Sequence, residues 1–193
     1  MSYHTVADIF AANDEVRSRL VARVENLSEA QQEFRPGADA WSAAEIIEHL
    51  ALIERRLTGL FNAMLKKIEG AGAEAQPRPM RPFSLDEFAE QARQKLDAPE
   101  GVRPRGGVRL ADSLAQLRAS RAALNALRPR VEAVDGASAI YPHPIFGPLN
   151  LYQWFAFIGV HEARHLRQIE RLLEQMKSVP PTSIAECGFR IAD

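Results

Sequence analysis

Two histidines lie four residues apart in the last long segment of the chain, Asn150 to Lys177. His161 and His165 fall where the three-and-four spacing of the surrounding apolar residues predicts a buried helical face. Residues four apart lie one above the other on a helix, so both imidazoles can reach a single ion. A buried, unpaired imidazole would cost about 1–3 kcal/mol, and a bound metal would explain why two of them lie on a core face.

A third histidine, His49, lies on the core stripe of an earlier helical segment, Ser42 to Glu69. Taken alone, His161 and His165 could equally be two partly exposed helix histidines. Three imidazoles on core stripes, however, are a sufficient ligand set for zinc or a similar divalent ion, with water completing an open site. The sequence therefore predicts that His49, His161 and His165 bind one divalent metal ion.

Glu162 completes the pattern H-E-x-x-H between the two later histidines. In zinc proteases this glutamate activates the bound water, but the chain offers no strand to align a peptide and no later histidine as third ligand. A ferritin-like site with two metals is disfavoured too, since it needs two E-x-x-H motifs. Glu162 stays a candidate catalytic base near the metal; the alternative is a charged residue that flanks the core stripe.

Two further polar residues are candidates to orient the imidazoles. Glu45 lies one turn before His49 and could hydrogen-bond that ring; the alternative is a capping box with Ser42 at the start of the helix. Gln168 follows His165 by three residues and could hydrogen-bond at the wall of a pocket, or else face solvent.

The remaining histidines, cysteine and aromatic residues receive weaker assignments. His143 lies between two prolines and could point into the site, but a surface position is favoured; His4 is assigned no role. The single cysteine, Cys187, excludes an internal disulfide and has no neighbour that would activate it as a nucleophile. Four aromatic residues are expected in the core or the pocket wall, namely Trp41, Trp154, Phe155 and Phe157.

Helical periodicity predicts four long helices that position these residues. They cover Thr5 to Leu27, Ser42 to Glu69, Leu110 to Leu127 and Asn150 to Lys177. Shorter helical segments are expected over Ser28 to Phe34 and Ser84 to Leu96, and Pro129 should end or kink the third long helix. Residues 131–150 are expected to be irregular. With four long helices and no clear strand, the predicted fold is an all-α four-helix bundle.

Length and charge limit the function classes. A chain of 193 residues fits one domain, which we expect over residues 1–178, followed by an irregular tail over 179–193. A net charge of -1 offers no electrostatic footprint for nucleic acid or an anionic membrane. We find no signal peptide or membrane span in the sequence, so a cytoplasmic protein is expected, and the apolar helix faces are compatible with a homodimer.

Two stretches resemble the DinB-like, or DinB/YfiT, superfamily of metal-binding four-helix bundles. Residues 41–50 give the pattern W-S-x-x-E-I-x-x-H-L, and residues 161–169 give H-x-x-x-H-x-x-Q-I. The resemblance implies that His49, His161 and His165 are the metal triad, holding zinc, nickel or another divalent ion with open water positions. It also implies an up-down-down-up bundle, in which the long connection between the second and third long helices is a crossover.

The same resemblance suggests three kinds of activity on a small-molecule substrate. Characterised relatives include transferases that use low-molecular-weight thiols such as bacillithiol, mycothiol or glutathione, a thiol-dependent isomerase, and proteins described as metal-dependent hydrolases. We expect a thiol S-transferase of detoxification type, in which the metal holds the thiol as a thiolate. The alternatives are a hydrolase that uses metal-bound water, with Glu162 as base, and a metal-stabilised binding or stress-response bundle without turnover.

Overall fold

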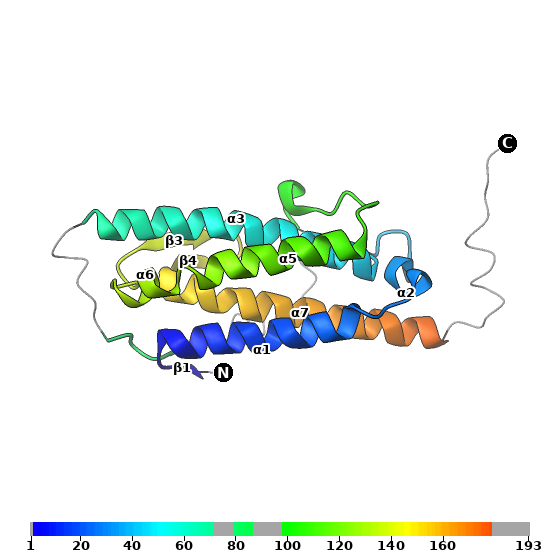
Figure 1. The fold of residues 1–193 in the computed structure, drawn as a ribbon, viewed down its shortest axis with the longest axis horizontal. Helices are drawn as coiled ribbons and strands as arrows, with labels where there is room; N and C mark the ends of the chain where they lie inside the picture. Colours follow the sequence, from blue (N-terminus) through cyan, green and yellow to red (C-terminus); the bar gives the residue numbers. More distant parts are fainter. Residues whose placement is uncertain (1, 72–78, 87–97, 179–193) are drawn as a thin grey trace.

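A computed structural model describes residues 2–71, 79–86 and 98–178, and four long helices in it form a bundle (Figure 1). The long helices are α1 (Val6–Val24), α3 (Ala43–Glu69), α5 (Leu110–Asn125) and α7 (Leu151–Ser178). The short helix α2 (Glu29–Glu33) precedes α3, and α6 (Arg128–Glu132) follows α5. The prediction of a four-helix bundle is confirmed.

The helices run up, down, down and up (Figure 1). Helix α1 is parallel to α7, because Asn13 bonds to Phe155 and, one turn on, Arg17 bonds to Glu162. Helices α3 and α5 are parallel to each other in the opposite direction, so α3 ends at one end of the bundle and α5 begins at the other (Figure 1). The predicted crossover is therefore present. The short helix expected over Ser84 to Leu96 lies mostly outside the described residues.

Reciprocal capping bonds fix where the two site-bearing helices begin. Ser42 caps α3 through a capping box with Glu45, and the amide of Asn150 donates to the side chain of Gln153 while the amide of Gln153 donates back. Pro129 falls in the first turn of α6, where its missing N–H leaves no hydrogen bond unmade. The prediction that it ends the helix before it is confirmed.

The prediction that residues 131–150 are irregular is wrong at both ends. Helix α6 extends to Glu132, and an antiparallel hairpin is formed by β3 (Ile140–His143) and β4 (Gly147–Asn150). Prolines normally argue against a strand, but Pro142 and Pro148 face each other across the ribbon, at a position where no ladder hydrogen bond is needed. Gly147 has a φ of 74°, which closes the three-residue loop.

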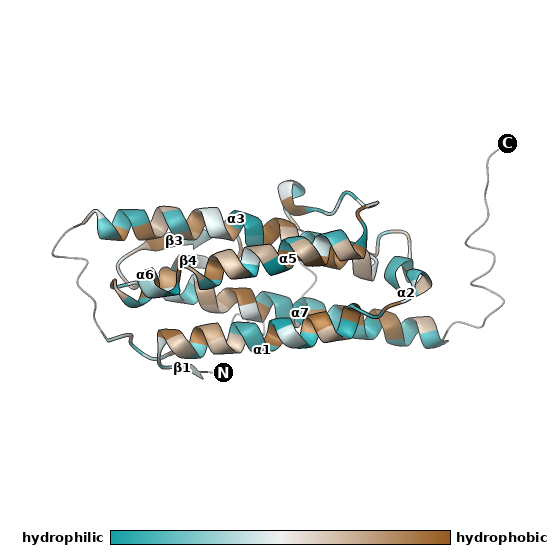
Figure 2. Ribbon diagram, viewed as in Figure 1, coloured by the Kyte–Doolittle hydropathy of each residue, from teal (hydrophilic) through white to brown (hydrophobic). Residues whose placement is uncertain are grey.

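Polar side chains separate two apolar clusters in the core. One cluster lies around Phe61 and Phe155 near the hairpin, and the other lies around Ile47 and Leu117 at the opposite end. Apolar and polar residues alternate along each long helix, as expected for amphipathic helices (Figure 2). A second, shorter ribbon joins β1 (Ser2–Tyr3) to β2 (Phe83–Ser84). Within the described residues, no helix is long and apolar enough to span a membrane.

Candidate metal centre

The three predicted ligands converge at the interface of α3 and α7. His49, His161 and His165 each offer a ring nitrogen, and these atoms lie within 4.8 Å of one another. The Nε2 atoms of His161 and His165 are 3.2 Å apart. Two nitrogens that bind one tetrahedral zinc at about 2.0–2.1 Å are separated by about 3.3 Å, so the observed spacing fits a shared ion.

Hydrogen bonds made by Nδ1 leave the Nε2 atoms of His49 and His165 unprotonated, each with a lone pair that can bind a metal. Nη1 of Arg164 lies 3.5 Å from Nε2 of His165. Nδ1 of His49 donates to the Val102 carbonyl at 2.7 Å, and Nδ1 of His165 donates to Oε1 of Gln168 at 2.9 Å. In a neutral imidazole with a proton on Nδ1, Nε2 carries a lone pair. Such partners orient metal-binding histidines and raise their basicity, so the donor set fits a divalent ion.

The partner of His49 comes from the far end of the crossover, in the 3-10 helix η2 (Glu100–Val102). The neighbouring Glu48 fastens the same segment to α3, since its two carboxylate oxygens accept from the amides of Arg105 at 3.0 Å and Gly106 at 3.2 Å. On its other side, the His49 ring contacts Trp41, with ring centroids 4.9 Å apart. Sequence periodicity gave no sign of Val102, because the crossover has no helical pattern.

The two residues proposed to orient the imidazoles have different outcomes. Gln168 accepts a hydrogen bond from His165, as expected for a residue that orients this imidazole. The carboxylate of Glu45 instead accepts from the amide of Ser42 at 2.9 Å and from Arg35 at 2.8 Å. The interpretation of Glu45 as the partner of His49 is therefore wrong, and the alternative of a capping box is what the structure shows.

The site strongly favours neutral imidazoles. Burial lowers the pKa of His49, and burial lowers that of His165 to about 3. The pKa of His161 also lies well below its usual value, because of burial and of the nearby His165 and His49. Metal binding requires unprotonated imidazole, so the surroundings keep all three residues in the form that an ion needs.

A pocket of about 340 Å³ opens over the triad. Its walls are mostly apolar, with aromatic rings from α7 and the hairpin, and its charged lining residues are Arg56, Arg164, Glu54 and Glu162. Trp41, Trp154 and Phe157 line it, and Phe155 is buried in the core. His143 also lines the pocket, so the favoured surface position for this residue is wrong. Such a cavity suits a small, largely apolar molecule.

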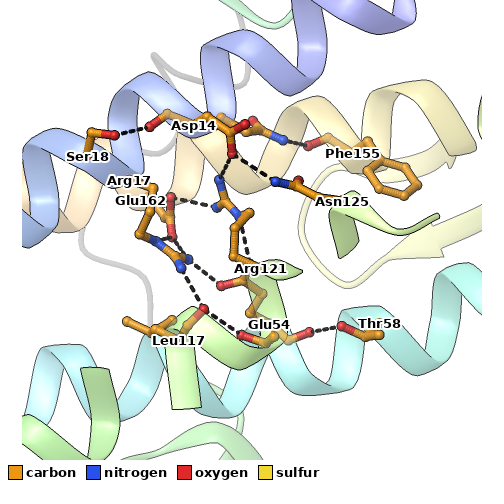
Figure 3. A network of polar contacts seen from close by, with 12 residues as sticks. Asp14, Arg17, Ser18, Glu54, Thr58, Leu117, Arg121, Asn125, Phe155 and Glu162 are labelled. Atoms are coloured by element: carbon orange, nitrogen blue, oxygen red, sulfur yellow. Dashed lines mark hydrogen bonds and ion pairs between the residues drawn. The ribbon is translucent and has the colours of Figure 1, made fainter. Parts of the chain in front are cut away.

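Glu162 belongs to a buried layer of ion pairs that includes one residue from each long helix (Figure 3). Arg17 of α1 and Arg121 of α5 both contact Glu54 of α3 and Glu162 of α7. Both carboxylate oxygens of Glu162 therefore accept from arginines, while burial raises its pKa against the effect of those arginines. Its contacts assign it a structural role, and its role as a base stays a prediction.

The sequence also matches the family model of the DinB superfamily over residues 12–169. The chain belongs to the DinB superfamily. The family resemblance noted from residues 41–50 and 161–169 is thereby confirmed.

One similar sequence and two similar structures were found for this DinB-superfamily chain, and both structures are four-helix bundles. The uncharacterised protein YuaE of Bacillus subtilis is 26% identical over 165 residues, which cover 85% of this chain and 96% of YuaE. The crystal structure of TT2238, a four-helix bundle protein, has a TM-score of 0.58 at 21% identity, covering 86% of this chain and 99% of TT2238. YfiT from Bacillus subtilis has a TM-score of 0.60 at 18% identity, covering 92% and 90% of the two chains. YfiT is described as a probable metal-dependent hydrolase with an unusual four-helix bundle topology.

Proposed function

We propose that this protein is an enzyme that depends on one divalent metal ion, with zinc or nickel as the first candidates, and acts on a small, largely apolar molecule. The observation that carries the proposal is the triad at the pocket, in which hydrogen bonds to Val102 and Gln168 leave Nε2 of His49 and of His165 unprotonated. When bound, such an ion acidifies a coordinated water or thiol, which supplies a strong nucleophile near neutral pH.

Three protein ligands favour a catalytic site over a structural one. Structural zinc sites are closed by four protein ligands, whereas catalytic sites keep a position open for water or substrate. Among the described residues, no fourth histidine, cysteine or carboxylate joins the triad. The pocket adjoins the open side, so a small molecule can reach the position. These features favour turnover over a metal-stabilised bundle that only binds.

Hydrolysis is the first reaction to test. It requires only water as the second reactant, and the fold is shared with YfiT, itself described as a probable metal-dependent hydrolase. The residues of this chain would hold the ion, bind the apolar part of the substrate and keep bulk water from the rest of the pocket.

Transfer of a low-molecular-weight thiol is the second candidate. Arg56 and Arg164 line the pocket, and guanidinium groups bind the carboxylates that such thiols commonly carry. The electrophile would then occupy the apolar part of the pocket. Dependence of turnover on added thiol separates this reaction from hydrolysis.

The deciding experiment is metal analysis by mass spectrometry of protein purified without chelator or affinity tag. We expect one divalent ion per chain in the wild type and in His4→Ala, a control at an exposed histidine, and loss of the ion in His49→Ala. Metal-loaded protein is then screened with esters, amides and thiol–electrophile pairs. If the wild type carries no metal and takes up no zinc, nickel or manganese on titration, the proposal fails.

A further inference from the structure

His143 is the last residue of β3 and lies at the turn of the β3–β4 hairpin, opposite Gly147. It lines the same pocket as the triad, although none of its atoms belongs to the group of metal-binding nitrogens. Pro142 and Pro144 flank it and restrict the backbone on both sides. The hairpin thus holds a fourth imidazole at the pocket, beside the metal site.

The turn fixes which nitrogen of His143 carries the proton. Nδ1 lies 3.1 Å from the amide nitrogen of Ile145 and 3.3 Å from that of Phe146. A backbone N–H can only donate, so Nδ1 must be the acceptor and carries no proton. The neutral ring therefore has its proton on Nε2, which points away from the turn. His143 is an N–H donor with the opposite tautomer to His49 and His165.

The surroundings of the ring leave this donor without an acceptor. The ring centroid lies 4.7 Å from that of Phe146, 5.0 Å from that of Trp154 and 4.7 Å from that of Phe157. The indole N–H of Trp154 already donates to the Tyr141 carbonyl at 3.0 Å. Within the described part of the chain, no protein group accepts a hydrogen bond from Nε2 of His143. An apolar wall with one polar donor is the usual means of orienting a small ligand.

We propose that His143 is a substrate-binding residue whose Nε2–H donates to the carbonyl oxygen of an uncharged substrate with an apolar body. This inference rests on the proposed function, since it places that carbonyl compound in the pocket over the triad. The aromatic side chains of the pocket wall contact the apolar body of the substrate, and the Nε2–H of His143 donates a hydrogen bond to its carbonyl oxygen. A neutral donor selects an acceptor and disfavours a cationic group at the same position.

Two substitutions distinguish the role of His143 as a hydrogen-bond donor in the pocket from its role in holding the turn of the hairpin. His143→Asn retains an acceptor near the position of Nδ1 for the turn amides and removes the pocket donor. His143→Gln places an amide N–H near the position of Nε2 and loses the acceptor that holds the turn. A structural role alone would make the glutamine variant the worse one. The proposal requires the asparagine variant to lose recognition of the carbonyl.

The binding test uses acetophenone and α-methylstyrene, which have nearly the same shape but differ by a carbonyl oxygen against a methylene. Affinities are measured on the full chain stripped of metal by a chelator, from the indole N–H signals of Trp41 and Trp154, which line the pocket. We expect the wild type to bind acetophenone more tightly than α-methylstyrene. In His143→Asn, this preference should fall by about 2- to 12-fold, because one neutral hydrogen bond contributes that much to the ratio of affinities. His143→Gln should keep the preference.

An unchanged preference in His143→Asn, or no binding of acetophenone to the wild type, would overturn the proposal. A second readout needs no variant: spectra of wild-type protein with 15N-labelled histidine should show the proton of His143 on Nε2 at neutral pH, and a proton on Nδ1 would contradict the argument. Both readouts are independent of metal. Failure of metal binding would therefore refute the proposed function alone, and failure here would refute the role of His143 alone.

Discussion

Replacing Glu162 by glutamine tests the buried ion-pair layer at its centre. The substitution preserves the shape of the side chain and removes its charge. In the wild type, two arginines face two carboxylates, so the formal charges of Arg17, Arg121, Glu54 and Glu162 cancel. Side chains in the layer are between 3% and 9% exposed, so water cannot replace a lost partner.

The expected loss of stability is large. Breaking a buried ion pair by removing one partner costs about 3–5 kcal/mol, because it leaves an uncompensated buried charge. In the variant, Glu54 still contacts both arginines, and Asp14 still accepts a hydrogen bond from Arg121 at 3.2 Å. The expected loss of stability therefore lies near the lower end of this range, at about 3 kcal/mol. A domain of this size is stable by about 5–15 kcal/mol, so the variant should still fold.

Urea denaturation followed by circular dichroism measures this loss in metal-free protein. The matched control is Glu132→Gln, which removes a carboxylate from an exposed pair with Arg128 at 2.7 Å, where both side chains are more than 40% exposed. Exposed pairs within a helix contribute about 0.3–0.5 kcal/mol. The slope of the free energy with urea should be unchanged in both variants, since neither alters the surface exposed on unfolding.

The reasoning is refuted if Glu162→Gln loses no more stability than Glu132→Gln. The same variant separates the two interpretations of Glu162. If Glu162 is a base, its replacement by glutamine lowers turnover by about 100-fold or more, while the free energy of unfolding stays near that of the wild type. If Glu162 acts only in the ion-pair layer, the main effect of the substitution is a lower free energy of unfolding.

Three further predictions concern the triad and the packing of α1 on α7. Burial lowers the pKa of His165 from 6.5 to about 3, so the unfolded chain binds more protons than the folded protein below pH 6.5. As the pH falls from about 7 to 5, this residue should lower the free energy of unfolding of metal-free protein by about 2 kcal/mol. Denaturation midpoints that rise as the pH falls over this range would contradict the prediction. Gly159→Ala would place Cβ 2.5 Å from Oδ1 of Asn13, an overlap that should cost about 1–3 kcal/mol in thermal unfolding against a helix-propensity gain of about 1 kcal/mol. Adding Asn13→Ala should remove that extra cost, and equal effects in both backgrounds would argue against the overlap. Gln168→Leu should weaken metal binding in calorimetry by about 10- to 100-fold, since it frees the Nδ1 proton of His165; an unchanged affinity would show that this bond does not matter.

Helical periodicity predicted the ligands well because they lie on regular elements. The histidines of α3 and α7 occupy positions that spacing alone assigns to the core, and two of them prove almost fully buried. The same signal was present and overlooked on α1 and α5, where Arg17 and Arg121 occupy core positions between apolar residues. Four charged residues on four core faces could have indicated a buried ion-pair layer. Their pairing could not be predicted, because it depends on the relative height of helices far apart in the chain.

The missed contacts lie in segments without periodicity. Val102 meets His49 across 53 residues of sequence, through a carbonyl group that every residue carries, so no residue type marks it. The hairpin was missed because its prolines argue against a strand in general, although a two-stranded ribbon tolerates them where they face each other. With the hairpin missed, His143 could not be placed at the pocket.

The ion-pair layer and the triad both lie between the same two pairs of helices. Helix α1 packs most extensively on α7, and α3 on α5, so the bundle consists of two parallel pairs. The triad takes His49 from one pair and His161 from the other, and the pocket lies between them. Arginine and glutamate side chains connect the two pairs directly, since Arg17 contacts Glu54 and Arg121 contacts Glu162. The two pairs of helices that supply the three imidazoles are therefore also joined by the charged layer, in which Glu162 is the residue next to His161.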